Sequence, residues 1–96
     1  MKTRLVSCDR EWTSLTIIDK RGKPIILGYG EIEKIKLGYY TEKKLFSKKT
    51  TEKIEFVLKK NNQSIILTKV MDWDYFDQYK KEVIRFAKDN KITLIE

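Results

Sequence analysis

The sequence predicts a single α+β domain in which a curved antiparallel sheet or small barrel is capped by one C-terminal helix. Three observations lead to this prediction. Apolar runs and alternating patterns separated by turn residues fill the chain up to about Val70. An amphipathic helical pattern follows over residues 72–89, and a short apolar segment follows at residues 92–95. A chain of 96 residues with 41% hydrophobic residues suits one domain with a modest core, so we assign residues 1–96 to it.

Strand-like segments open the chain at residues 4–8 and 12–18, which we expect to pair with each other. The second segment alternates apolar and polar residues, as a half-buried strand does. Gly22 supplies positive φ for the next turn. Pro24 has no N–H to donate within a sheet, so it is expected to start the short strand that continues through residues 25–27.

The middle of the chain predicts a bulge and a longer pair of strands. Ile32 and Ile35 would lie on opposite faces of a regular strand, so a turn or bulge must separate them if both point into one core. Alternation is regular from Ile35 onward and resumes over residues 54–59. Residues 61–62 favour a turn, after which residues 65–67 form the last strand before the helix.

The helical pattern over residues 72–89 is the clearest segment. At 100° per residue its apolar side chains share one arc of roughly 160°. That arc contains Trp73, Phe76, Tyr79, Val83, Ile84, Phe86 and Ala87. Asp72 fits an N-cap, and Asn90 suits a left-handed terminating residue. Lys80 falls inside the apolar arc, which favours a packed stem with its amine in water; a buried functional amine is the alternative.

The residue inventory argues against an enzyme. The chain contains no histidine and one cysteine, Cys8, so the common nucleophile–base pairs and zinc sites cannot be assembled. Cys8 is expected to be a small buried hydrophobe. Asp72, Asp74 and Asp77 suit the first turn of a helix better than a metal cluster. We therefore expect no catalytic residues, no cofactor and no metal.

Hydropathy predicts no transmembrane segment, because no apolar run approaches the ~20 residues that cross a bilayer. The N-terminal residues also lack the apolar stretch of a secretory signal. These two observations favour a cytoplasmic location.

The order of these segments carries a resemblance to a known family. It consists of a strand, a glycine turn, residues 29–35 (Tyr-Gly-Glu-Ile-Glu-Lys-Ile), a strand ending at residues 59–62, the strand at 65–67 and one capping helix. Over roughly residues 12–90 the chain resembles a bacterial pleckstrin-homology-like (PH-like) domain. The resemblance implies a curved sheet with the helix across one open end, and binding of lipids, peptides or proteins. Phosphoinositide-binding members carry a basic motif where this chain has Asp9-Arg10-Glu11, which argues against that ligand.

The basic residues are unevenly spread and indicate a candidate binding surface. The net charge is +7, from 21 Lys and Arg against 14 Asp and Glu. Residues 39–49 interleave aromatic residues with lysines, a combination that suits anionic partners. The candidate contact residues are Lys43, Lys44, Lys48, Lys49, Tyr40 and Phe46, with Lys20, Arg21 and Lys23 as a second patch. The alternative is a hairpin whose aromatic residues enter the core and whose lysines are only solvated.

Together these features predict a non-catalytic binding or interaction module. An acidic protein or peptide surface is the first expected partner and an anionic membrane lipid the second. Nucleic acid ranks third, because base reading relies on arginine and the four arginines are scattered. The alternatives are a subunit of an enzyme that a partner chain completes, and a homodimer that pairs an exposed strand edge.

Overall fold

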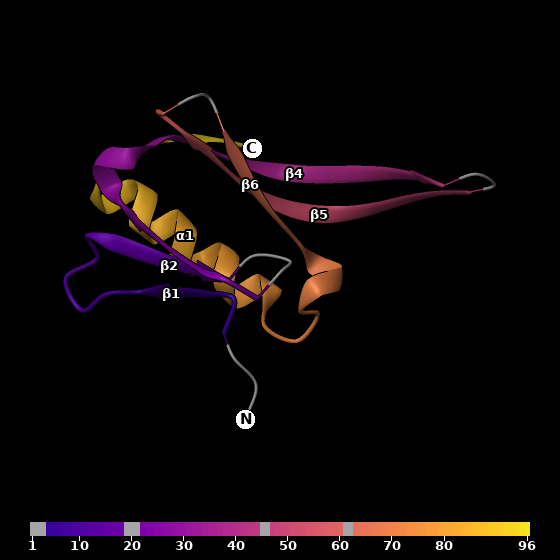
Figure 1. Ribbon diagram of the computed structural model, residues 1–96, viewed down its shortest axis with the longest axis horizontal. Coiled ribbons are helices and arrows are strands. Elements are labelled where there is room, and N and C mark those ends of the chain that lie inside the picture. Colours follow the sequence, from indigo (N-terminus) through magenta and orange to yellow (C-terminus); the bar gives the residue numbers. More distant parts are fainter. Residues whose placement is uncertain (1–3, 19–21, 45–46, 61–62) are drawn as a thin grey trace.

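The computed structural model describes residues 4–18, 22–44, 47–60 and 63–96, and these residues form an α+β fold. The strands are β1 (Val6–Cys8), β2 (Ser14–Ile18), β3 (Pro24–Gly28), β4 (Ile32–Lys44), β5 (Ser47–Leu58), β6 (Ser64–Thr68) and β7 (Thr93–Ile95). Helix α1 covers Phe76–Asp89, and two 3-10 turns, η1 (Tyr29–Glu31) and η2 (Lys69–Met71), lie between strands and before the helix. Figure 1 shows this arrangement.

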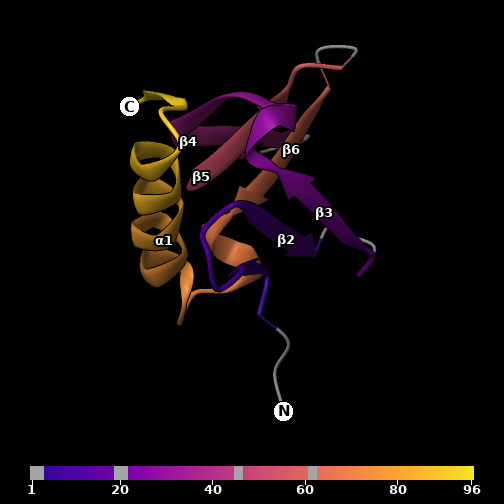
Figure 2. The ribbon, with the colours of Figure 1, turned by 90° about the vertical axis from the view of Figure 1, so that its left-hand side faces the viewer.

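The strands form two open sheets rather than one continuous curved sheet or closed barrel. One sheet has the order β1-β2-β3 and the other β6-β5-β4-β7. The break falls at η1, where Gly28 N–H donates to Glu31 Oε1 at 3.1 Å and Tyr29 N–H donates to the carbonyl of Thr13 at 3.0 Å. These bonds turn the chain out of the first sheet and into β4 (Figure 2). The expected sheet therefore divides at the residues that interrupt its apolar pattern.

Local predictions within the strands are confirmed. Gly22 has φ 79°, and β3 begins at Pro24. The register of β4 with β5 shifts between Ile32 and Lys34, which is the irregularity that brings Ile32 and Ile35 into the same core. The turn expected at residues 61–62 lies outside the described residues.

The last strand adds a parallel pair to a sheet whose other described pairs are antiparallel. β7 pairs with β4 in parallel, with Ile35 opposite Leu94. Helix α1 separates β7 from the earlier strands and returns the chain to the edge of the larger sheet. Parallel pairing follows because a crossover, not a hairpin, makes this connection.

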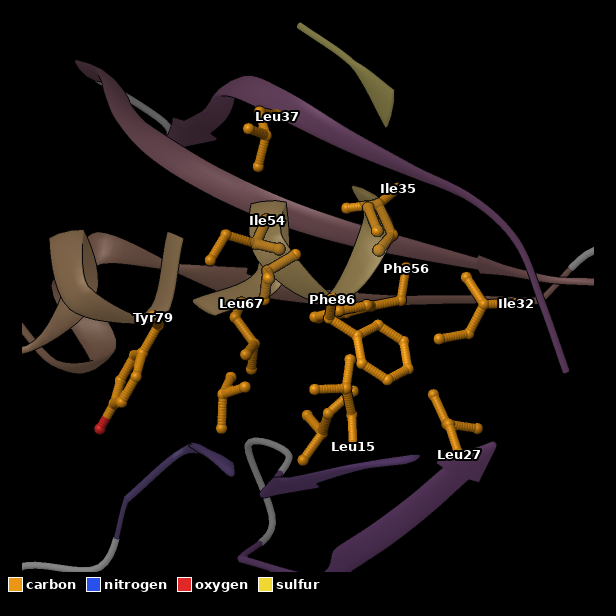
Figure 3. Close-up of a cluster of buried hydrophobic side chains, with 14 of the residues drawn as sticks. Leu15, Leu27, Ile32, Ile35, Leu37, Ile54, Phe56, Leu67, Tyr79 and Phe86 are labelled. Atoms are coloured by element: carbon orange, nitrogen blue, oxygen red, sulfur yellow. The ribbon is translucent and has the colours of Figure 1, made fainter. Parts of the chain in front are cut away.

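The core lies between the two sheets and is closed by α1. Leu15, Ile17 and Leu27 enter it from the smaller sheet. The larger sheet and the helix supply Ile32, Ile35, Ile54, Phe56, Leu67, Phe76, Tyr79, Val83, Phe86 and Ala87. Figure 3 shows the labelled side chains of all three layers converging in one cluster. The apolar arc of the helix therefore packs into the same cluster as the strand residues.

The start of the helix differs from the prediction. Helix α1 begins at Phe76, and Trp73, which precedes it, is 63% exposed rather than part of the buried arc. Asp72 is not the N-cap. Its carboxylate is buried and accepts a hydrogen bond from the Tyr79 hydroxyl at 2.7 Å. The contact with Tyr79, about one turn into the helix, replaces the expected contact with amides of the first turn.

The end of the helix also differs by one residue. Asn90 has φ −109°, whereas Lys91 has φ 56° and is the left-handed residue. Ile92 N–H donates to the carbonyl of Ala87 at 2.8 Å, which completes a Schellman motif. The side-chain amide of Asn90 instead donates to the carbonyl of Trp12 at 2.7 Å, which connects the helix end to the β1–β2 turn.

Candidate functional site

Strands β4 and β5 continue past the core as a projecting hairpin. The last buried pair is Leu37 opposite Ile54, and the pairs beyond it are Tyr39 with Glu52, Thr41 with Thr50 and Lys43 with Lys48. We call residues 39–44 and 47–52 the hairpin arm. The arm extends along the longest of the molecular dimensions, 45 × 33 × 22 Å, beyond the remaining elements (Figure 1).

The arm brings together the lysines that the sequence singled out. Strand β4 ends at Lys44 and β5 begins at Ser47, so Lys43, Lys44, Lys48 and Lys49 all lie at its tip. Lys43 stands directly opposite Lys48, while Lys49 stands opposite Glu42. Like charges directly opposite each other are unfavourable in an antiparallel pair. The backbone therefore concentrates positive charge at the end of the arm.

Of the second predicted patch, the structure describes Lys23 alone. Lys23 is exposed and immediately precedes β3, in the smaller sheet, so it shares no element with the arm. Lys20, Arg21 and Phe46 lie outside the described residues.

The aromatic residue that the arm exposes is Tyr39, not Tyr40. Tyr39 is 69% exposed, whereas Tyr40 is half-buried and lies opposite Thr51 on the other face. The alternation from Ile35 places Tyr39 on the same strand face as the buried Ile35 and Leu37. Tyr39 is nevertheless exposed because the core ends at Leu37, one pair earlier. The length of the core depends on packing between distant segments, which a strand pattern does not report.

Carboxylates near the root of the arm are already matched by lysines. Glu52 Oε2 lies 3.4 Å from Lys80 Nζ, and Glu55 Oε1 lies 2.7 Å from Lys53 Nζ. The hydrogen bond from Lys53 holds the pKa of Glu55 below its ordinary value. The half-buried Lys80 thus packs its stem in the helical arc and directs its amine to a surface carboxylate, as predicted.

Two further groups have structural explanations. Burial, followed by the nearby carboxylates of Glu82 and Asp9, raises the pKa of the Cys8 thiol to about 11. The Tyr79 hydroxyl accepts from Leu5 N–H at 3.1 Å in addition to donating to Asp72. Neither arrangement pairs a nucleophile with a base.

A pocket of about 330 Å³ lies between η1 and the end of β5. It is lined by Gly30, Glu31, Leu58, Lys59, Lys60 and Gln63. The Glu31 carboxylate is engaged by Gly28 N–H, and both lysines are exposed. The carboxylate in this pocket is therefore already used to hold the η1 turn.

In the described part of the chain, no three Asp, Glu, Cys or His side chains gather to hold a metal ion. Among the same residues, no helix is long and apolar enough to cross a membrane. No family model, curated protein or solved structure matches the chain. The resemblance to a PH-like domain therefore stays a prediction.

Proposed function

We propose that the protein is a non-catalytic interaction module that binds an acidic protein or peptide surface through the hairpin arm. The observation that carries the proposal is the charge at the tip of the arm, where Lys43 stands opposite Lys48 on a hairpin that projects beyond the core. An acidic partner would complement the lysine charge of the arm and would be steered toward it.

Arginine placement supports a protein partner over nucleic acid. Arg4 contacts the carboxylate of Glu82, and the guanidinium of Arg85 lies 4.1 Å from the centre of the Trp12 ring. Both arginines therefore serve the packing of α1 rather than the arm. The described arm contains lysine alone as its cation, and lysine is a point charge rather than a bidentate reader of base edges.

The PH-like resemblance, proposed on the order of segments, agrees with a binding role. The proposal places that binding in the cytoplasm, where a lone thiol such as Cys8 stays reduced.

The test uses a fluorescein-labelled polyglutamate peptide and measures its binding by fluorescence anisotropy. The variant replaces Lys43, Lys44, Lys48 and Lys49 with glutamine. We expect affinity to fall by at least about tenfold and the salt dependence between about 50 and 200 mM to flatten. Circular dichroism checks that the fold is retained.

A matched control replaces four exposed lysines elsewhere, Lys59, Lys60, Lys81 and Lys88, with glutamine. It removes the same net charge, so equal weakening by both variants would show that the arm has no special role. Absence of peptide binding by the unsubstituted protein would also overturn the proposal. Tighter binding to phosphatidylserine vesicles or to oligonucleotides than to the peptide would contradict the proposed class of partner.

A further inference from the structure

We infer that the acidic partner binds one face of the hairpin arm, the face that carries Tyr39, and places an apolar side chain against Tyr39 beside its carboxylates. This inference rests on the proposed function and names the surface through which it acts. We call this surface the Tyr39 face; its described members are Tyr39, Thr41, Thr50 and Glu52, and the pair Lys43–Lys48 follows in register.

The Tyr39 face continues the apolar side of the larger sheet past the end of the core. Ile35 and Ile54 on this side are fully buried and Leu37 is 8% exposed, yet Tyr39 in the next position is 69% exposed. Among the described residues, Tyr39 has the most exposed of the large hydrophobic side chains. A large aromatic side chain left outside the core in this way is typical of a contact residue in a protein interface.

Charge on the Tyr39 face is positive toward the tip. The carboxylate of this face belongs to Glu52, which lies 3.4 Å from Lys80 of α1. Lys48 is exposed, and the residue opposite it in the register is Lys43 rather than an acid. On the opposite face the register sets Glu42 against Lys49. The register therefore pairs lysine with lysine on the Tyr39 face and lysine with glutamate on the opposite face.

The middle of the face is held by a cross-strand hydrogen bond. The hydroxyls of Thr41 and Thr50 lie 3.2 Å apart, between Tyr39 at the root and Lys48 near the tip. From root to tip the surface thus presents an aromatic ring, two hydroxyls joined by a hydrogen bond, and cations. A partner segment with one apolar side chain followed by carboxylates matches this order.

The composition of the arm favours a peptide over single-stranded nucleic acid. Beyond Lys53, which pairs with Thr68 of β6, the described sheet consists of β4 and β5 only. Stacking of single-stranded nucleic acid uses successive aromatic residues, whereas the described part of this face has one.

The experiment compares substitutions on the two faces of the same arm. Lys43→Gln with Lys48→Gln alters the Tyr39 face, and Lys44→Gln with Lys49→Gln removes equal charge from register positions of the opposite face. The probe is a labelled polyglutamate peptide with one central leucine. We expect the first variant to weaken binding by about tenfold and the second by about threefold or less.

Tyr39 is tested with a second peptide in which serine replaces the leucine. Tyr39→Ala should weaken the leucine peptide by about tenfold and the serine peptide by less than about threefold, while Tyr40→Ala, the matched change on the other face, should not discriminate between them. Thermal unfolding monitored by circular dichroism confirms that each variant is folded at the assay temperature.

The outcomes separate the inference from the proposed function. If the lysine pairs weaken binding equally, or Tyr39→Ala affects both peptides alike, the choice of face is wrong while the arm still binds acidic peptides. If the unsubstituted protein binds neither peptide, the proposed function fails and the inference fails with it. Binding that is as tight for an uncharged glutamine peptide would overturn both.

Discussion

The Tyr79 hydroxyl joins three segments that are far apart in the sequence. It accepts from Leu5 N–H ahead of β1 and donates to the buried carboxylate of Asp72 ahead of α1. Tyr79→Phe leaves that amide without the hydroxyl and removes one donor from Asp72. We expect a loss of about 2 kcal/mol in the free energy of unfolding, measured by urea denaturation. Tyr39→Phe removes an exposed hydroxyl and should change stability by less than about 0.5 kcal/mol; equal effects would contradict this role.

Cys8 is held as a thiol by its surroundings. Burial is the largest cause, and the pKa rises from 9.0 to about 11. The thiolate is the reactive form, so at about pH 8 its population is roughly a hundredfold lower than for an unshifted cysteine. We expect alkylation by iodoacetamide to be correspondingly slow at that pH and to accelerate as the pH rises toward 11. Labelling in about 8 M urea is the control; a folded protein that reacts as fast would contradict the shift.

The end of α1 carries a strained residue that a glycine would relieve. Lys91 occupies the left-handed position of the Schellman motif with φ 56°. Glycine adopts that conformation without the steric cost of a Cβ, so Lys91→Gly should stabilise the protein by about 0.5–1 kcal/mol in urea denaturation. Lys81→Gly makes the same change at an exposed position inside the helix and should destabilise by about 1 kcal/mol. Shifts of the same sign in both variants would contradict the assignment.

Elements whose form depends on neighbouring residues could be predicted from the sequence. Pro24 begins a strand because it lacks an N–H, and the spacing of Ile32 and Ile35 requires a bulge in any strand that buries both. The helix could be predicted from its periodicity, and five members of its arc are buried within α1. These features are visible because their causes lie within a few residues.

Elements that depend on distant partners could not be predicted. Helix α1 does not begin at Asp72, whose carboxylate accepts from Tyr79 instead, and the exposure of Tyr39 follows from where the core ends. The parallel pairing of β7 depends on where α1 delivers the chain. For the candidate site, the sequence identified the lysine-rich segment and gave a hairpin as one interpretation of it. Which residues share a face of that hairpin could be learned only from the register of β4 with β5.

At the scale of the whole molecule, one cluster of side chains holds both sheets and the helix together. Phe86 of α1 is fully buried and belongs to the same cluster as Leu15 of β2 and Phe56 of β5 (Figure 3). The two sheets share no strand, and β3 reaches β4 through the η1 turn. The two sheets are therefore held together by side-chain packing against the helix. Because they share one core, loss of that packing would leave neither sheet with a core of its own.

This shared core predicts that the two sheets unfold together. Phe86→Ala should lower the free energy of unfolding by about 3–5 kcal/mol, and Val83→Ala, the milder change, by about 2 kcal/mol. Trp12 lies against the core beside the β1–β2 turn, so in a Trp73→Phe background its fluorescence follows the smaller sheet. Circular dichroism follows the backbone as a whole. The two urea transitions should coincide in the parent and in Val83→Ala, because a single cooperative unit has one midpoint. A Trp12 transition at lower urea than the circular dichroism transition would show that the smaller sheet detaches first and that α1 does not bind the sheets into one unit.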